Sequence, residues 1–344
     1  MRKILSLTLA CVLSVSLLAS CGGGNSGNGG GSGGGATSGG GASVTPQDLV
    51  MGTGSTGGTY FALGGAMANA INNKLGEQKI TVTAQSTGAS VENINLLNNS
   101  ELDLGIAMNN VAANAHDGEG AFASPVTNVA AIGVVYNEVY QIVANANTGA
   151  TDVAGLKGYK IAVGPAGSGT VGLSEKVFAA AGLNIDKDIQ RQSDSFGDAA
   201  TKMQDGHIDA ACNVLAVPAS SIVEMTTSLD LAYINISDEI LAEIQKDAPY
   251  FTRKVIPAGT YPGQAEDCNT ITCKAVLYCR ADLDEETVYQ LTKAFYESGD
   301  EIGAAHATGK EVQLEGCLDG VTTPIHPGAA RYFEEMGMDV PDNG

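Results

Sequence analysis

The sequence predicts an α/β fold of two lobes, joined by a hinge of two crossing strands, that close on one small polar ligand. The same strand–loop–helix unit occurs twice, at residues 48–74 and 160–181. Strands and helices also alternate along the chain, which is typical of a parallel sheet that binds ligands at the carboxyl ends of its strands. Two long apolar runs, 129–146 and 270–280, have the length to cross between the lobes as a hinge.

The first unit begins with the apolar strand 48–51 and continues through the Gly/Ser/Thr loop 52–59. It then opens a helix that is predicted from Tyr60 to about Lys74. Glycine lets the backbone approach a ligand closely, and the free N–H groups of a helix start, with the neighbouring hydroxyls, supply donors. The loop therefore predicts a cradle for an anion.

The second unit repeats this arrangement about 110 residues later, with the strand 160–163, the loop 164–170 and a helix over 171–181. One such loop is a weak indication of an anion site. Two of them in one chain predict that two lobes hold one ligand from opposite sides.

Two further strand–turn–helix segments follow the first unit. The strand 79–84 leads into the polar turn 85–90 and a helix over 91–98, and the strand 103–108 ends at Asn109-Asn110. All of these polar turns lie at strand ends, so the parallel sheet would bring them to one edge.

The second half of the chain repeats this plan. A helix is predicted around 198–205, and the strand 209–214 is the counterpart of 103–109. C-terminal helices over 284–302 and 328–336 are expected to pack back on the first lobe.

We expect lobe 1 to comprise residues 46–145 and 270–344, and lobe 2 to comprise residues 146–269. Lobe 1 is then formed by two separate segments and lobe 2 by one continuous segment, because the chain passes from one lobe to the other twice.

The first 45 residues are predicted to lie outside the fold. Two basic residues precede the apolar run 4–18, which is too short to span a bilayer and is typical of a signal peptide, here residues 1–20. The run ends in Leu-Ala-Ser-Cys, which resembles the bacterial lipobox and implies a diacyl anchor on Cys21; an ordinary signal peptide with a chance cysteine is the alternative. Residues 21–45 are predicted to be a Gly/Ser tether. These features imply an extracytoplasmic protein, lipid-anchored to the bilayer of a bacterial membrane at the cell surface or in the periplasm.

The composition excludes some classes of partner. The formal net charge is −20, which argues against nucleic acid and against an electrostatic grip on anionic lipid. Tryptophan is absent, so no stacking platform for sugars or bases is indicated.

Five cysteines follow Cys21, and outside the cytoplasm they could form disulfides. Their odd number leaves at least one free, and the sequence does not fix the pairing. Cys268 and Cys273 are close enough in sequence to close a local loop. A metal site is disfavoured, because the chain has no Cys-x-x-Cys motif and no histidine near these cysteines. The five are Cys212, Cys268, Cys273, Cys279 and Cys317.

No catalytic or cofactor motif is complete. The loop 52–57 has the Gly-x-Gly-x-x-Gly spacing of a dinucleotide site, but the next strand ends in Thr83-Ala84-Gln85 without the acidic residue that binds ribose. The loop 164–170 lacks the lysine of a P-loop, and it is not Gly-x-Ser-x-Gly. We therefore expect binding without catalysis, and no cofactor. The four histidines are scattered and are expected in exposed or capping roles: His116, His207, His306 and His326.

Two acidic features differ in what they predict. Four acidic residues between 282 and 286 lie where a helix should begin, and the helix dipole explains them. Glu138 instead interrupts the apolar run 129–146 near the expected hinge, where a carboxylate is costly unless it is satisfied. Glu138 is therefore either a structural residue or a contact for a ligand amine.

Six segments, in order and spanning nearly all of residues 48–337, resemble the TAXI-type solute receptors of TRAP transporters. The segments are Gly52-Thr-Gly-Ser with Gly58-Thr-Tyr, Ser86-Thr-Gly-Ala-Ser-Val-Glu-Asn, Gly164-Pro-Ala-Gly-Ser-Gly-Thr, Asp205-Gly-His-Ile-Asp-Ala, Ile256-Pro-Ala-Gly-Thr-Tyr-Pro-Gly-Gln and His326-Pro-Gly-Ala.

The resemblance implies a type II periplasmic-binding-protein (Venus flytrap) fold without catalysis. It also implies delivery of a small carboxylate or amino-acid ligand, glutamate or a related acid, to TRAP membrane permease subunits. A ligand-binding subunit of a membrane signalling system on the same scaffold is the alternative. An exported enzyme with unrecognised chemistry has less support.

The resemblance also suggests the ligand-binding residues. Opposing helix starts at Thr59/Tyr60 and Ser168/Thr170 could hold a carboxylate without a cation, and no arginine lies in any of the segments. The chain departs from the family at Asn110, where aspartate is frequent, and at Val217, where an aromatic residue is frequent. The candidates are Ser55, Thr59, Tyr60, Thr87, Ser90, Asn93, Asn109, Glu138, Gly167, Ser168 and Thr170.

Overall fold

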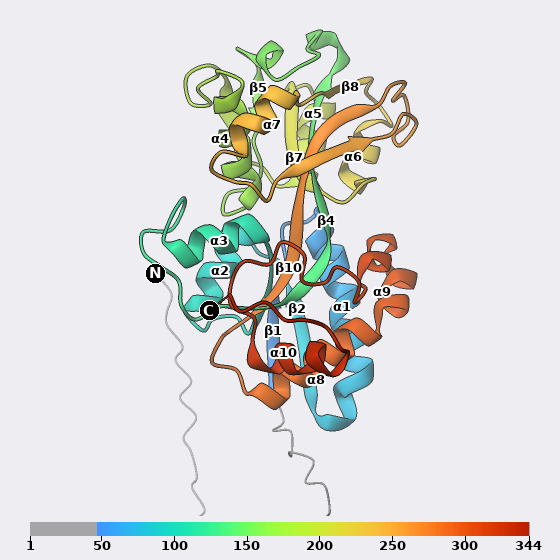
Figure 1. Cartoon of the computed structure of the whole chain (residues 1–344). Helices are drawn as coiled ribbons and strands as arrows, with labels where there is room; N and C mark the ends of the chain where they lie inside the picture. The colour runs from blue at the N-terminus through green and yellow to red at the C-terminus, as the bar shows by residue number, and fades with distance from the viewer. Residues whose placement is uncertain (1–46, 344) are drawn as a thin grey trace, which may run out of the picture. The chain divides into compact units, whose positions relative to one another are not determined.

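The computed structural model describes residues 47–343, which belong to one compact unit (Figure 1). The predicted signal peptide 1–20, the lipid anchor on Cys21 and the tether 21–45 lie outside the described residues. Within the described part of the chain, no helix combines the length and apolar character that crossing a bilayer requires.

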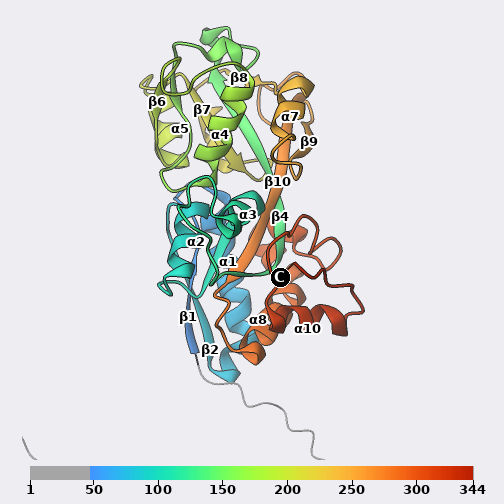
Figure 2. The same cartoon turned by 60° about the vertical axis from the view of Figure 1, so that its left-hand side comes forward.

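Two long strands run side by side from one lobe into the other (Figure 1, Figure 2). They are β4 (Ala130–Asn145) and β10 (Cys268–Cys279), and they pair antiparallel from Thr272 opposite Val139 to Cys279 opposite Ala130. The prediction of a two-lobed α/β fold with two crossing strands is confirmed. Both strands are almost fully buried, which explains why they appear in the sequence as continuous apolar runs.

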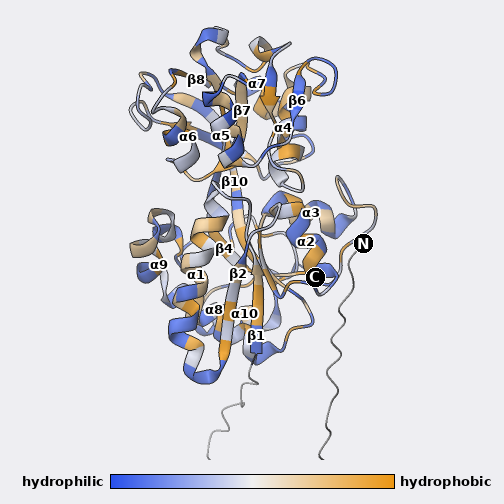
Figure 3. Ribbon diagram, turned by 180° about the vertical axis from the view of Figure 1, so that it is seen from behind, coloured by the Kyte–Doolittle hydropathy of each residue, from blue (hydrophilic) through white to orange (hydrophobic). Residues whose placement is uncertain are grey.

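The sheet of the first lobe has β1 (Gln47–Gly52) between β2 (Ile80–Gln85) and β3 (Leu104–Met108), all parallel. The crossing strand β10 pairs antiparallel with β3. β1 starts with two polar residues, which are followed by the apolar stretch Leu49–Met51 (Figure 3). Each parallel strand is followed by a helix, so three helices begin at the carboxyl edge of the sheet: α1 (Thr59–Leu75), α2 (Ser90–Asn98) and α3 (Asn109–Asp117).

The C-terminal segment packs on the first lobe, as predicted, but it contains one more helix than expected. The interval 284–302 is divided into α8 (Glu285–Glu297) and α9 (Gly299–Ala305). The break lies at Ser298, and a Cβ on Gly299 would be 2.4 Å from the carbonyl oxygen of Val312. Glycine at position 299 thus leaves room for the backbone of the segment that follows α9. The last helix, α10 (Pro327–Glu335), packs against α8.

The sheet of the second lobe repeats the parallel core, with β5 (Lys160–Ala162) between β6 (Gln190–Gln192) and β7 (Ala210–Leu215). β7 pairs antiparallel with β4. Two short strands flank the crossing pair, β8 (Leu231–Ile234) on β4 and β9 (Thr252–Ile256) on β10. The helices of this lobe are α4 (Gly169–Ala180), α5 (Phe196–Gln204), α6 (Ser220–Met225) and α7 (Asp238–Ile244).

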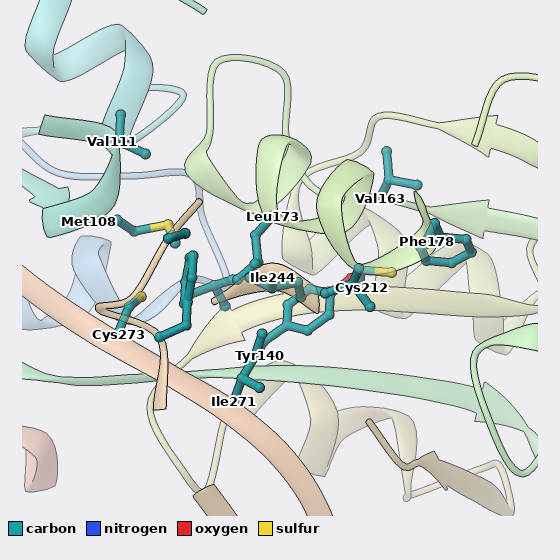
Figure 4. Packing of buried hydrophobic residues seen from close by; sticks show 14 of the residues in the cluster. Met108, Val111, Tyr140, Val163, Leu173, Phe178, Cys212, Ile244, Ile271 and Cys273 are labelled. Atoms are coloured by element: carbon teal, nitrogen blue, oxygen red, sulfur yellow. The ribbon is translucent and has the colours of Figure 1, made fainter. Parts of the chain in front are cut away.

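One buried hydrophobic cluster continues from one lobe into the other (Figure 4). It contains Met108 and Val111 from the first lobe, and Leu173 and Phe178 of α4 from the second. Tyr140 of the crossing strand lies in the same cluster. The two lobes therefore share a core beside the hinge, at the place where the ends of their parallel strands approach each other.

The five described cysteines are all buried and free, so the local disulfide considered from the sequence is wrong. Cys268 and Cys273 both lie on β10, five residues apart. In an extended strand this separation places them on opposite faces and about 16 Å apart, whereas a disulfide needs Cα atoms within about 7 Å.

Candidate ligand-binding site

The two predicted cradles have the same backbone conformation. In the first, the N–H of Gly58 donates to the carbonyl of Ser55 at 3.1 Å, and Gly57 between them has φ +79°. In the second, the N–H of Ser168 donates to the carbonyl of Pro165 at 3.1 Å, and Gly167 also has φ +79°. A four-residue turn with positive φ at its third position favours glycine there, which explains why the sequence repeats it.

Each turn leads into a helix without a side-chain cap. The residues that precede α1 and α4, Gly58 and Ser168, have nearly the same dihedral angles (φ −90°, ψ 153° and φ −90°, ψ 154°). Neither helix has an acidic residue in its first turn. Four other helices, α5, α7, α8 and α10, have an N-cap side chain that accepts a backbone N–H, whereas α2, α3, α6 and α9 also lack such a cap. The first N–H groups of α1 and α4 are therefore left to serve as donors to an anion.

Both helix starts line one small cavity, which has about 20 Å³ of space in this closed arrangement of the lobes. Among its described lining residues are no lysine, arginine or histidine. Seven of the residues proposed from the sequence line it: Ser55, Thr59, Tyr60, Ser90, Glu138, Ser168 and Thr170. The rest of the wall is mainly apolar or glycine: Gly54, Gly58, Ala89, Met108, Tyr136, Gly169, Phe196, Val214 and Leu215.

The lobes are closed around this cavity. The N–H groups of Val91 and Glu92, at the start of α2, donate to the carbonyl of Gly167 at 3.0 and 3.1 Å. On another side of the cavity, the N–H of Ala216 donates to Oγ1 of Thr59 at 3.0 Å. A third contact joins the two lobes where the N–H of Gly197 donates to the carbonyl of Thr56 at 3.4 Å.

Glu138 is the only acidic residue that lines the cavity among the residues described, and its side chain is 2% exposed. Its Oε2 accepts a hydrogen bond from the hydroxyl of Tyr60 at 2.8 Å, and its Oε1 accepts one from Tyr136 at 3.2 Å. Burial raises the pKa of Glu138 to about 8, although the two tyrosine hydrogen bonds act in the opposite direction. Cys273 lies opposite Glu138 in the β10 register, and burial also raises the pKa of its thiol.

Four of the proposed residues do not line the cavity. Asn93 is fully buried; its Nδ2 donates to the carbonyls of Thr53 and Ile106, both at 2.8 Å, and its Oδ1 accepts from the hydroxyl of Thr87 at 2.7 Å. Asn93 and Thr87 thus hold the polar turns of the first lobe together.

Asn109 and Gly167 also serve the framework around the cavity. The Nδ2 of Asn109 donates to the carbonyl of Gly320 at 2.9 Å, and its Oδ1 accepts from the N–H of Lys274 at 3.2 Å. The carbonyl of Gly167 accepts the hydrogen bonds from α2 that join the lobes. A direct contact of these four residues with ligand stays a prediction.

Residues 51–337 match the sequence profile of the NMT1-like family. The chain belongs to the NMT1-like family. Its structure is similar to a binding protein component of an ABC phosphonate transporter from Pseudomonas aeruginosa, with a TM-score of 0.50 and 12% identity over 78% of this chain and 81% of that chain. This likeness shows the type II periplasmic-binding-protein fold and does not identify the ligand.

Two other solved structures resemble this NMT1-like chain. The alkanesulfonate-binding protein from Xanthomonas axonopodis pv. citri bound to MOPS has a TM-score of 0.47 and 16% identity over 85% of this chain and 84% of that one. The substrate binding protein of an amino acid ABC transporter has a TM-score of 0.46 and 15% identity over 75% of this chain and 97% of that one.

Sequence reasoning missed part of the cavity wall of this NMT1-like protein. Tyr136 could have been found, because it lies two residues before Glu138 and successive alternate residues of a strand share a face. Phe196, Val214 and Leu215 carry no comparable sequence pattern, since they look like ordinary core residues. Within residues 47–343, no group of His, Cys, Asp and Glu side chains is arranged to hold a metal ion.

The histidines have the roles expected from the sequence. His326 caps α10, where its Nδ1 accepts from the N–H of Gly328 at 3.1 Å, and His306 accepts from the N–H of Thr308 at 3.3 Å. His116 and His207 are exposed.

Proposed function

We propose that this NMT1-like protein is an extracytoplasmic solute receptor that captures a small organic acid or amino acid between its lobes. The observation that carries the proposal is the pair of uncapped helix starts, one on each lobe, that line the same closed cavity. Two aligned sets of backbone N–H groups can hold a carboxylate without a cationic side chain. The crossing strands β4 and β10 supply the hinge about which the lobes would open and close.

The chemistry of the cavity favours binding over catalysis. Its hydroxyls come from serine, threonine and tyrosine, and no described lining residue is a histidine or lysine that could activate one of them as a nucleophile. The carboxyl of Glu138 is engaged by two tyrosine hydroxyls. The cavity thus provides donors that fix a ligand in place, without a set of residues that completes a reaction.

The partner and the anchor belong to the same proposal. The resemblance to TAXI-type receptors supports delivery of the solute to TRAP membrane permease subunits, and glutamate, which that resemblance implies, is among the solutes to test. A diacyl chain on Cys21 and the tether 21–45 would keep the protein beside that permease on the outer side of the membrane. The similar structures named above also include binding components of transporters.

A binding screen tests this proposal. The purified protein, freed of bound solute, is titrated calorimetrically and by thermal shift with amino acids, 2-oxo acids, dicarboxylates and other small organic acids. A ligand at 100 times its dissociation constant should stabilise the fold by about 2.7 kcal/mol. We also expect vesicles that contain a TRAP permease from the same genome to take up the identified solute only when the receptor is present. Binding of no solute from any of these classes would contradict the receptor proposal.

A further inference from the structure

Glu138 is a buried carboxyl, and no cationic side chain of the described residues is paired with it. Both of its hydrogen-bond donors, Tyr60 and Tyr136, are neutral hydroxyls, and its pKa is raised chiefly by burial with no lysine or arginine acting on it. A carboxylate has about four acceptor positions, so two remain after the tyrosines are counted. Removing an ionised carboxylate from water without a counter-charge is costly. A side chain of this kind, placed in the wall of a ligand cavity, indicates that a cation can come from the ligand.

Another part of the same cavity attracts negative charge. The starts of α1 and α4 each carry a partial positive charge of about half an elementary charge, and neither is balanced by an acidic residue in its first turn. The two regions are joined by Tyr60, which is the second residue of α1 and also donates to Glu138. The cavity therefore has an electropositive side formed by two helix starts and an electronegative side formed by one carboxyl. The start of α1 and the carboxyl of Glu138 are separated by the length of one tyrosine side chain.

We propose that Glu138 is the counter-charge for the ammonium group of the solute, whose carboxylate lies at the starts of α1 and α4, so that the solute is an amino acid with one carboxylate. This inference rests on the proposed receptor function and names its solute class. The balance of charges in the cavity is the reason for proposing a solute with one ammonium and one carboxylate. Glu138 carries a proton at neutral pH when no cation is beside it, and we expect the ammonium of the solute to displace that proton. Ionised Glu138, one ammonium, one carboxylate and two helix starts then sum to about zero. A second carboxylate on the solute, as in glutamate, would add an uncompensated negative charge while Glu138 is ionised.

The rest of the wall fits the same class. Met108, Phe196, Val214 and Leu215 line the cavity as apolar surface. An apolar solute side chain loses water favourably against such surface, whereas a second charged group would lose its hydration without a partner. A small apolar side chain on the amino acid is therefore preferred over a polar or charged one.

The test compares each amino acid with the 2-oxo acid that has a carbonyl group in place of its amine. Calorimetric titrations pair alanine with pyruvate, valine with 2-oxoisovalerate, and glutamate with 2-oxoglutarate. We expect the wild-type protein to bind the amine member of the preferred pair at least about tenfold more tightly, since a hydrogen bond between charged groups is stronger than a neutral one. We also expect alanine or valine to bind more tightly than glutamate.

Glu138→Gln keeps the shape of the side chain and removes its charge. We expect it to lose the preference for the amine, while the 2-oxo acid binds as well as it does to the wild type. Glu311→Gln is the matched control, because Glu311 accepts hydrogen bonds from Asn137 next to Glu138 and does not line the cavity. It should keep the preference. Thermal unfolding without solute verifies that both variants are folded.

The possible results separate this inference from the receptor function. Loss of the amine preference in Glu138→Gln alone supports the inference. Binding of solutes without an amine preference in the wild type, or a preference that survives in Glu138→Gln, overturns it and leaves the receptor function intact. Tighter binding of glutamate than of alanine or valine overturns the restriction to one carboxylate. If no solute binds at all, the receptor function fails and the inference falls with it.

Discussion

The two cradles have the same backbone and different side chains. Their turns share a 3.1 Å hydrogen bond, a third residue at φ +79° and a helix start without a side-chain cap. In the first cradle the second helical residue is Tyr60, which reaches Glu138; in the second it is Thr170. The comparison teaches that the backbone provides a general anion site on each lobe. The preference for an amine that we propose comes from Glu138 on the crossing strand β4, which only the first cradle contacts, through Tyr60.

The largest expected difference between the two cradles concerns how the stability of the protein depends on pH. Only the first cradle is hydrogen-bonded to a buried carboxyl. Glu138 has a pKa of about 8 in the folded protein and about 4.3 in an unfolded chain. The folded state therefore binds the proton more tightly. The free energy of unfolding should fall by up to about 1.4 kcal/mol per pH unit between about pH 4.5 and pH 8 from this group.

Chemical unfolding at a series of pH values in the absence of solute measures this slope, and Glu138→Gln should make it smaller in that window. At pH 8 the variant should be more stable than the wild type, since it has no carboxyl to ionise. The groups that surround the carboxyl, Tyr60, Tyr136 and Cys273, have pKa values raised by burial and do not titrate in this window. Equal slopes in the two proteins would show that Glu138 does not behave as a buried acid.

A smaller effect should come from the two glycines at φ +79°. Alanine at either Gly57 or Gly167 introduces the same backbone strain, about 1–2 kcal/mol. The surroundings differ. A Cβ at Gly57 would be 2.6 Å from the backbone nitrogen of Gly197 on the other lobe, whereas a Cβ at Gly167 would make an ordinary 3.4 Å contact with Glu92.

We therefore expect Gly57→Ala and Gly167→Ala to lose similar stability, while Gly57→Ala also impedes closure. An added closure cost of about 1–3 kcal/mol lowers the solute affinity roughly 5- to 150-fold. Calorimetry gives the affinities and small-angle X-ray scattering with saturating solute shows whether the lobes close. Gly172→Ala, with open space around its Cβ, is the helix control and should retain affinity. Equal affinities of the Gly57 and Gly167 variants would mean that the two turns do not differ in closure.

The sequence predicted those elements of the fold whose pattern is strong. β1, β4, β7 and β10 are apolar runs and were found nearly to their ends, as was α1. The short strand β6 reads Gln-Arg-Gln and is largely exposed, so it carries no apolar pattern, and it forms only by pairing with β5. The break between α8 and α9 was missed because no proline marks it, and the close approach of Val312 to Gly299 comes from a segment that follows α9.

The residues of the candidate site, too, could be predicted only where the local sequence has a recognisable pattern. Polar residues in the cradles could be found because glycine turns before helices have a recognisable sequence. Asn93 looks equally polar in sequence, and only the folded structure shows that its amide is used by Thr53, Ile106 and Thr87. Whether a buried polar side chain faces a ligand or the backbone depends on tertiary neighbours, which local sequence does not contain.

The smallest effect should distinguish the serines of the two cradles. Ser55 lines the cavity, and its Oγ is buried without a hydrogen-bond partner among the residues described. Ser168 also lines the cavity, but its hydroxyl donates to the carbonyl of Pro165 at 2.6 Å within its own turn. The hydroxyl of Ser55 is therefore available to a solute, whereas that of Ser168 is used by the protein.

We expect Ser55→Ala to lower the affinity for the identified solute about 2- to 10-fold and to change stability little, since one hydrogen bond contributes about 0.5–1.5 kcal/mol. Ser168→Ala should show the reverse, with a loss of about 1 kcal/mol in unfolding free energy and a smaller loss of affinity. Titration calorimetry and chemical unfolding of both variants measure the two quantities. If Ser168→Ala instead loses more affinity than Ser55→Ala, its hydroxyl must leave Pro165 and turn to the solute when the lobes close. The second cradle would then contribute a side chain to recognition, and the proposal that it supplies only a general backbone site would be wrong.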